Sequence, residues 1–260
     1  MSPRLLLSLA TAVLALALGS SARATINYSD CTGTTVEYTN ISESSADEPL
    51  YNAPTCIGDL LDFNPTGFEA NSGTANPDQI DGNLLFTVSA LDNFLVDNLI
   101  LEENGDWQVF GFEPSNSLAS VTLTVRLEIL VTPFAGDPFV VEYLRQTPLQ
   151  FTTASTGPID VWAIHEEFLM ASILAEACSG TGYFTSAIPG ACGATTADVG
   201  VNIDNTLLAY AVSGELSFIN KKDFDGFTIT TETEPVPEPA TGALLALGLV
   251  VISAARRRHA

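Results

Sequence analysis

Apolar and polar residues alternate most regularly near the centre of the chain, in the stretch SVTLTVRLEILVT at residues 120–132. Every second residue from Val121 to Val131 is apolar and the residues between them are polar, with Leu130 as the one exception. A period of two residues is typical of a β-strand with one buried face and one face in water. We therefore predict a half-buried strand here.

Shorter runs of strand-forming residues flank this segment on both sides. They lie at residues 36–39, 84–90, 94–101, 106–112, 138–144, 149–153, 207–214, 215–220 and 226–232. The stretch EENGD at Glu102–Asp106 predicts a turn between two of these runs, and four prolines predict loops over residues 43–77. Closely spaced strands with short turns are typical of an antiparallel β-sandwich or jelly roll, so the predicted fold class is mainly β.

Residues 161–178 depart from the strand pattern. Ile164, Phe168 and Ile173 recur at roughly helical spacing, which predicts an amphipathic helix packed on the sheet. Gly180 supplies a stop signal at the end of this helix. A pair of strands is the alternative interpretation of the same residues.

The first 24 residues have the features of a secretory signal peptide. Arg4 supplies a positive charge, Leu5–Leu18 forms an apolar stretch, and small residues at Ala22 and Ala24 mark a cleavage site. The apolar stretch is short for a membrane span, so we expect the mature chain to begin near Thr25. An uncleaved membrane anchor is the alternative.

Charge is distributed unevenly along the chain. Of nine basic residues, five lie in the two terminal segments, whereas all 31 acidic residues lie between Asp30 and Glu238. The part between the terminal segments therefore holds four basic residues and a formal charge of −27. Such a surface repels phosphate backbones, which argues against nucleic-acid binding, and it attracts divalent cations. Solubility outside the cell is the simpler explanation of the acidity.

The four cysteines, Cys31, Cys56, Cys178 and Cys192, all lie in the exported part of the chain. An even number of cysteines in an oxidising compartment predicts disulfides. Three pairings are open, and Cys31–Cys56 with Cys178–Cys192 is favoured because short loops close at a lower entropic cost. A zinc site made of four thiolates is the alternative, but the usual CxxC spacing is missing.

The body carries no complete catalytic motif. His165 stands in the sequence IHEEF, which is comparable to the zinc-protease helix motif, but Leu169 occupies the position of the second histidine. A solvated helix face explains His165 and its neighbouring glutamates better. We therefore predict that the protein is not an enzyme and that it needs no cofactor.

Calcium also has a candidate site in the sequence. Asp223 and Asp225 in the stretch DFDG are spaced so that both could ligate calcium, with Gly226 allowing the turn. The glutamate that closes a full calcium loop is missing, so an ordinary acidic turn between strands is preferred. A glycosidase needs only two close carboxylates, and so many acidic residues are present that no pair stands out.

The chain ends in an apolar segment followed by arginines. Residues 231–239 form an acidic, proline-rich linker, and the 16 residues from Ala240 to Ala255 would make a helix of about 24 Å. This is shorter than the roughly 30 Å hydrocarbon core, but arginine side chains reach into the headgroups. Because Arg256, Arg257 and Arg258 resist transfer across the membrane, residues 240–260 are expected to form a transmembrane helix with a stop-transfer tail.

Three features occur in order at the end of the chain: the triplet Pro237-Glu238-Pro239, an apolar helix rich in Leu, Gly and Ala, and the basic tail at 256–258. Together they resemble the PEP-CTERM sorting signal, over about the last 25 residues. The resemblance implies a Gram-negative exported protein that is recognised through the triplet and cleaved by an exosortase. It also implies an association with the cell surface and with exopolysaccharide.

The predicted architecture is a signal peptide at 1–24, an antiparallel β-sandwich body at 25–230 with one packed helix, and the linker and sorting segment behind it. The predicted function is a non-enzymatic structural or adhesive role in the envelope or exopolysaccharide matrix. The alternative is a carbohydrate-binding or carbohydrate-cleaving module, with calcium as candidate cofactor. Trp107 and Trp162 could stack on sugar rings in such a module, but packing in the core is the preferred use of these rings. A tail retained as a permanent anchor is a third interpretation.

Overall fold

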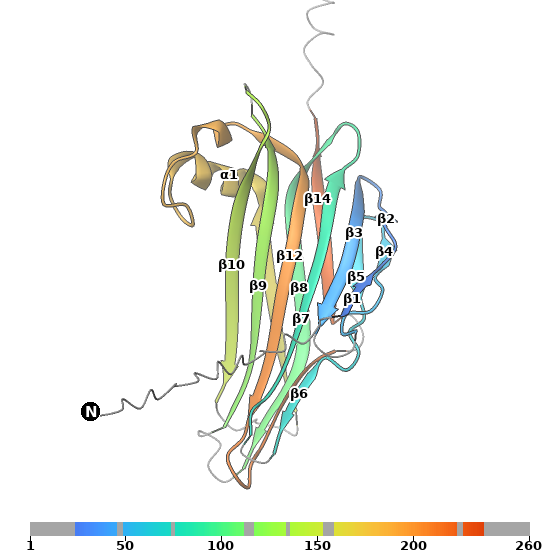
Figure 1. Cartoon of the computed structure of the whole chain (residues 1–260), viewed down its shortest axis with the longest axis vertical. Helices are drawn as coiled ribbons and strands as arrows, with labels where there is room; N and C mark the ends of the chain where they lie inside the picture. Colours follow the sequence, from blue (N-terminus) through green and yellow to red (C-terminus); the bar gives the residue numbers. More distant parts are fainter. Residues whose placement is uncertain are drawn as a thin grey trace, which may run out of the picture.

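Two antiparallel β-sheets pack face to face and run along the long axis of the molecule (Figure 1). The computed structural model describes residues 24–45, 49–73, 76–111, 117–133, 136–152, 159–222 and 226–236. Within these ranges each sheet has seven strands, and an α-helix lies at one end of the sandwich. The prediction of a mainly β, antiparallel sandwich with a packed helix is confirmed.

The first sheet, sheet A, carries the strand that the alternating pattern predicted. Its strands, in spatial order, are β1 (Ala24–Asn27), β3 (Val36–Ser45), β7 (Asp78–Ala90), β12 (Thr195–Tyr210), β9 (Leu118–Thr132) and β10 (Phe139–Phe151), with β2 (Cys31–Thr32) paired to β3. The long β9 therefore lies between β12 and β10, and β10 forms the edge of the sheet.

The second sheet, sheet B, is built around one long strand, β8 (Phe94–Phe110). Its order is β4 (Thr55–Ile57), β5 (Leu60–Phe63), β14 (Phe227–Pro235), β8, β13 (Leu216–Lys221) and β6 (Glu69–Ser72), with β11 (Asp160–Leu169) also paired to β8. One side of β8 pairs with β14 over its first half and with β13 over its second half, while β11 pairs along the other side.

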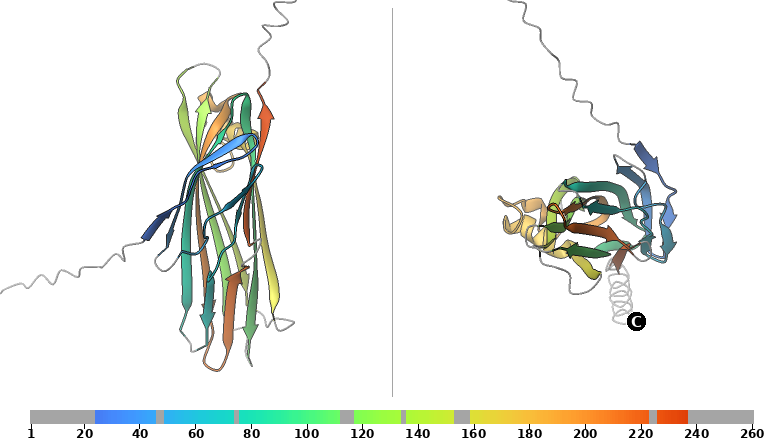
Figure 2. Two further views of the ribbon diagram at one scale, coloured as in Figure 1. Left: turned by 90° about the vertical axis from the view of Figure 1, so that its right-hand side faces the viewer. Right: turned by 90° about the horizontal axis from the view of Figure 1, so that it is seen from below.

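Alternation along the strands fills the space between the sheets. On β9 the residues Val121, Leu123, Val125, Leu127, Ile129 and Val131 are all at most 1% exposed. Apolar side chains of β8, among them Leu99, Leu101 and Val109, meet them from sheet B. The two-residue period thus builds one continuous core between the two sheets. Figure 2 shows the two layers of strands in side and end views.

The predicted turn at Glu102–Asp106 is wrong, because β8 runs through this stretch without interruption. Glu103 points into the core, where it meets a lysine, and Gly105 lies beneath the ring of Trp162. A charged residue and a glycine are weak strand formers by local preference, and here partners from distant strands decide the outcome.

The two short strands predicted at 138–144 and 149–153 are a single strand, β10, so that boundary is also wrong. Pro148 lies inside this strand, opposite Thr122 of β9. Proline is tolerated there because β10 is an edge strand, whose outer backbone groups have no ladder to complete.

The predicted helix at 161–178 is correct only in its second half. The chain continues as the strand β11 through Leu169, and the helix α1 covers Met170–Ser179. Met170, Ile173, Leu174 and Ala177 are buried along one face of α1, which explains the helical part of the pattern. The helix ends at Gly180, whose φ of 67° is the left-handed conformation that glycine adopts most readily.

The linker predicted from residue 231 begins later than expected. The strand β14 continues to Pro235, with Thr231 buried, and Val236 N–H donates to the carbonyl oxygen of Asn93 at 2.8 Å. The segment predicted to be rich in loops likewise holds the end of β3 and the short strands β4, β5 and β6. In the described part of the chain, no helix has both the length and the apolar character that a membrane crossing requires.

Candidate functional site

The outer face of sheet A, which points away from the core, carries two adjoining hollows. The smaller, of about 200 Å³, lies over β7, β12 and β9, and the larger, of about 390 Å³, extends toward β10. Arg126 and Asn202 line both hollows. We call this pair of hollows the sheet-A groove.

Strand register places the groove side chains in one row across four strands. Asn202 on β12 lies opposite Leu85 on β7 and opposite Arg126 on β9, and Leu144 on β10 continues the row. Gly200, two residues along β12, has no side chain to fill the space beside Glu128. The pleat of the sheet therefore builds the groove from residues far apart in the sequence.

The groove combines hydrogen-bonding and apolar groups. Asn83 Nδ2 donates to Asn202 Oδ1 at 2.5 Å, and Leu85 is 44% exposed beside them. Asp204 adds a carboxylate to the wall of the larger hollow, and Arg126 has no ion-pair partner among the described residues. Amide, carboxylate and guanidinium groups together bind hydroxyl-rich ligands through directed hydrogen bonds.

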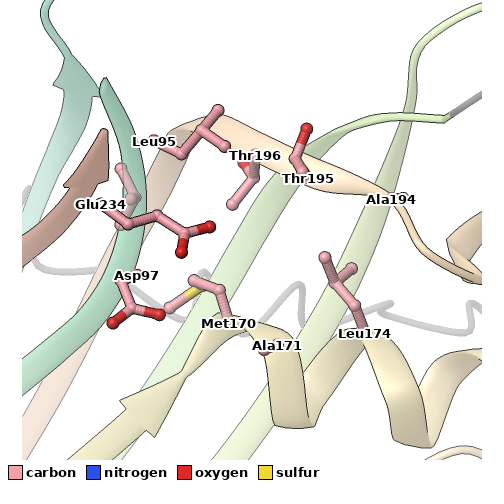
Figure 3. A pocket seen from close by; sticks show the side chains of 10 residues that line it. Leu95, Asp97, Met170, Ala171, Leu174, Ala194, Thr195, Thr196 and Glu234 are labelled. Carbon is pink, nitrogen blue, oxygen red and sulfur yellow. The ribbon is translucent and has the colours of Figure 1, made fainter. Parts of the chain in front are cut away.

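A much smaller hollow lies where α1 meets the sheets, near the end of β14. Figure 3 shows the carboxylates of Asp97 and Glu234 beside Met170 and Leu174 in this hollow. Its volume of about 40 Å³ has room for water but not for a sugar residue. This hollow is therefore a poor candidate for a binding site.

A buried cluster of polar side chains lies between the sheets. Lys221 on β13, Glu103 on β8 and Asn205 on β12 are each at most 1% exposed. Lys221 Nζ lies 3.0 Å from Glu103 Oε1, and Asn205 Nδ2 donates to the same oxygen. Burial lowers the pKa of Lys221, while the Glu103 carboxylate acts in the opposite direction. We call these three residues the core triad.

Aromatic rings close the space around the lysine of the core triad. The centroids of the Tyr51, Phe68 and Phe227 rings lie 5.0, 4.9 and 4.6 Å from Lys221 Nζ. Sequence reasoning missed the triad, because its members come from three strands. The one local sign of the triad was the stretch EENGD, whose polar residues interrupt a run of strand-forming residues.

The sequence predicts His165 on a solvated helix face. The structure places it on the strand β11 instead. Its Nδ1 is 3.2 Å from Glu102 Oε1 and its Nε2 is 3.1 Å from Glu167 Oε1. The carboxylates of Glu167 and Glu102 raise the pKa of this histidine. The described residues contain no group of three or more His, Cys, Asp and Glu side chains arranged to hold a metal ion.

The structure pairs Cys31 with Cys56 and Cys178 with Cys192, which is the pairing with the shorter loops. The first bridge joins β2 of sheet A to β4 of sheet B, and the second fastens α1 to the loop that follows it. All four cysteines are therefore used in bridges.

Both tryptophans lie in the core, which confirms core packing as the preferred use of their rings over sugar stacking. Trp107 is 8% exposed and stacks on Phe151 with a centroid distance of 4.5 Å. Trp162 is 4% exposed, and its Nε1 donates to the carbonyl oxygen of Asn220 at 3.0 Å. Neither ring face is open to a ligand.

Several predicted site residues lie outside the described residues. They are Ala22 of the cleavage site, Asp223 and Asp225 of the candidate calcium turn, Pro237, Glu238 and Pro239 of the triplet, and Arg256, Arg257 and Arg258 of the tail. The signal and transmembrane helices, at 1–24 and 240–260, lie outside them too, except that Ala24 begins β1.

Comparison with solved structures finds distant likenesses. One is TmCBM61 in complex with beta-1,4-galactotriose, at 11% identity and a TM-score of 0.22, covering 75% of this chain and 90% of that one. Another is the enzymatically active domain of bacteriophage CBA120 tailspike protein 4, at 9% identity and a TM-score of 0.17, covering 63% of this chain and 19% of that one. Scores this low carry no inference about ligands. No curated protein matches the sequence.

The end of the chain gives the clear match. A family model described as the PEP-CTERM protein-sorting motif matches residues 235–258, from the last residue of β14 through the basic tail. The matched segment contains the Pro237-Glu238-Pro239 triplet, the apolar run and the arginines in that order. Residues 235–258 of this protein are therefore a PEP-CTERM protein-sorting motif, which implies export and sorting to the cell surface.

Proposed function

We propose that this protein is a non-enzymatic structural or adhesive component of the bacterial envelope or its exopolysaccharide matrix, displayed at the surface by exosortase-dependent sorting. The observation that carries the proposal is the junction between body and signal. β14 lies inside sheet B between β5 and β8, and the sorting motif begins at its last residue. A body joined so directly to its sorting signal is suited to fixed display at a surface.

The extended shape and the bridges support the same role. Long strands run the length of the sandwich, and two disulfides fasten its peripheral segments. Disulfides are stable in the oxidising space outside the cytoplasm, where a matrix component works. The formal charge of −27 keeps the body soluble. It also repels anionic polymers unless a cation bridges the two.

The test is complementation of a strain that lacks the protein but has an exosortase. Wild type is expected in the surface or matrix fraction, and cells expressing it should regain attachment to the matrix. Replacing Pro237, Glu238 and Pro239 together by alanine should hold the protein in the membrane fraction and abolish the recovery. Glu234→Ala, an exposed change just before the motif, is the matched control and should sort normally.

Two results would overturn this proposal. Uncut wild-type protein in the cytosol with reduced cysteines would exclude export. Purified protein that shortens or chemically alters the cell's own exopolysaccharide would exclude a non-enzymatic role.

The sheet-A groove favours a second candidate function, the binding of a carbohydrate chain. Asn83, Asn202, Arg126 and Asp204 offer donors and acceptors for hydroxyl groups, and Leu85 offers an apolar surface for a sugar ring. The groove crosses several strands, as an extended polymer requires. Its volumes fall within or near the range of small-ligand sites.

A glycan array with the purified mature protein tests this second function, with calcium and with a chelator. Arg126→Gln combined with Asn202→Ala should remove binding, whereas Gln150→Ala, on the same face at the far end of β10, should leave it intact. Binding that survives the double substitution would exclude the groove. Binding that disappears with the chelator would assign calcium a role in it.

A further inference from the structure

The core triad brings an amine, a side-chain amide and a carboxyl group together at a single oxygen atom. We propose that Lys221 and Asn205 become joined by a covalent amide bond between their side chains, with Glu103 as the catalytic carboxyl group. Lys221 Nζ and Asn205 Nδ2 both donate to Glu103 Oε1, and all three side chains are closed to solvent. The nucleophile and the group it attacks are therefore both held against the acid–base group, at the same oxygen atom.

The surroundings favour the unprotonated amine that such an attack requires. Lys221 Nζ is enclosed by the rings of Tyr51, Phe68 and Phe227, and burial lowers the pKa of the lysine. A lysine amine in an apolar pocket is activated by the loss of its hydration. Transfer of one proton from Nζ to Glu103 turns the buried ion pair into a neutral amine and a neutral acid.

Two buried atoms of the triad have no hydrogen-bond partner among the described residues, and both belong to the groups that react. They are Oε2 of Glu103 and Oδ1 of Asn205. A half-turn of the Asn205 amide exchanges Oδ1 and Nδ2, which places Oδ1 against the carboxyl group. Protonated Glu103 then donates to Oδ1 and draws electrons away from Cγ, so that Cγ becomes the better target for the amine.

The reaction balances without a cofactor or an oxidant. The lone pair of Lys221 Nζ forms a bond to Asn205 Cγ, and the carbonyl electrons move onto Oδ1. Glu103 carries a proton from Nζ to Nδ2, the Cγ–Nδ2 bond breaks, and ammonia leaves. An amine and a primary amide thus become a secondary amide and ammonia, and no atom changes its oxidation state.

The fixed geometry raises the rate of this reaction far above that of free amines and amides in water. Groups held in contact react as if at effective concentrations of ~10⁵–10⁸ M. The product also removes a buried charge pair, whose desolvation is costly. Its N–H donates to Glu103 and its carbonyl oxygen accepts from the same group, so the two unpartnered atoms gain partners. Escape of ammonia to the solvent makes the step irreversible.

The bond would join the two layers of the sandwich. Asn205 lies in the middle of β12 in sheet A, and Lys221 is the last residue of β13 in sheet B. The two strands otherwise pack against each other across the core. A secondary amide resists reduction, so this link would persist where the disulfides are reduced.

Mass spectrometry of the full wild-type protein, purified from its surface fraction and reduced, tests the proposal directly. The expected mass is that of the processed chain minus one ammonia. A glutamate-specific protease cleaves after Glu215 and so separates Asn205 from Lys221 in an unlinked chain. The linked chain should instead give one branched peptide that contains both residues. A mass equal to that of the full processed chain, without the loss of ammonia, would overturn the proposal. Loss of ammonia together with two linear peptides would also overturn it, because that result indicates a cyclised asparagine.

Matched substitutions test the role of the carboxyl group. Glu103→Gln should abolish the branched peptide, and Asn205→Asp should replace the loss of ammonia by the loss of water. Glu43→Gln is the control, because Glu43 is 1% exposed in the same core but bonds to Tyr28 and to backbone groups at Leu50 and Tyr51. It should keep the full cross-link. A folded Glu103→Gln protein that is still fully linked would overturn the catalytic assignment, with folding checked by circular dichroism.

Discussion

Arg145 on β10 and Glu166 on β11 form an ion pair, with Nη1 of the arginine 2.8 Å from Oε2 of the glutamate. β10 is the edge of sheet A, and β11 pairs with β8 of sheet B and with no other strand in the described ranges, so the ion pair closes one side of the sandwich. Glu166 also accepts from the hydroxyl of Thr147, and Arg145 also donates to the hydroxyl of Tyr143 at 3.0 Å. One guanidinium and one carboxylate thus bind the free edges of both sheets.

Glu166→Gln should weaken this closure. The substitution removes the charge but keeps the shape, and Glu166 is 14% exposed whereas Arg145 is 38% exposed, so solvent screens part of the effect. We expect a loss of about 1 kcal/mol in the free energy of unfolding, measured by urea denaturation. Glu142→Gln on the outer face of β10 is the control and should change the stability by less than about 0.5 kcal/mol. Equal effects of the two substitutions would show that the pair does not hold the edges.

His165 should titrate above its ordinary pKa of 6.5, because Glu167 and Glu102 favour the imidazolium. A raised pKa in the folded state means that the protonated form adds stability below pH 6.5, and that this contribution is lost as the pH rises through the folded-state pKa. NMR titration of the imidazole signals measures the pKa of His165. Glu102→Gln with Glu167→Gln should return the pKa toward 6.5, and a wild-type value at or below 6.5 would contradict the geometry.

Gly105→Ala should destabilise the sandwich, because a Cβ there would lie 2.0 Å from the Asn220 carbonyl oxygen and 2.1 Å from the Trp162 ring. Overpacking of this kind costs roughly 1–3 kcal/mol. Gly200→Ala is a matched control in a strand of the other sheet, where the new Cβ would meet its nearest atom at 3.4 Å. Thermal unfolding should separate the two variants. A Gly105→Ala protein as stable as Gly200→Ala would exclude the close approach of Trp162.

Removal of the Cys178–Cys192 bridge by serine at both positions should release α1 from the loop that follows it. The bridge closes a sequence separation of 14 residues, for which chain entropy predicts a loss of about 3 kcal/mol. Hydrogen exchange should accelerate in α1 and change little in β9 and β12, because the bridge does not reach those strands. Unchanged exchange in α1 would mean that packing alone holds the helix.

Local pattern predicts the layers of this fold, but it also predicts interruptions that the strands do not have. β9 was predicted because each of its inward residues is apolar and meets a core that any sandwich supplies. The sequence predicts two strands in place of β8, because Glu103 and Gly105 are typical turn residues. Their partners Lys221 and Trp162 come from other strands and stabilise a continuous strand here. Long-range partners of this kind leave no trace in the periodicity of the strand that they stabilise.

The functional residues divide in the same way. The sorting motif is a continuous segment, so the sequence alone reveals the Pro237-Glu238-Pro239 triplet. The sheet-A groove depends on the register of β7, β12 and β9, which places Leu85, Asn202 and Arg126 in one row. Register is set by the whole sheet, and no spacing within a single strand predicts it.

The position of β14 determines how the body would respond to a pull on the end of this strand. Tension applied at Val236 acts along the strand, and the backbone hydrogen bonds from β14 to β5 and β8 lie across it. The load is therefore carried in shear by many bonds at once, and they do not open one after another as in a zipper. A cell held in flowing water by this protein would pull against the mechanically strongest direction of its last strand.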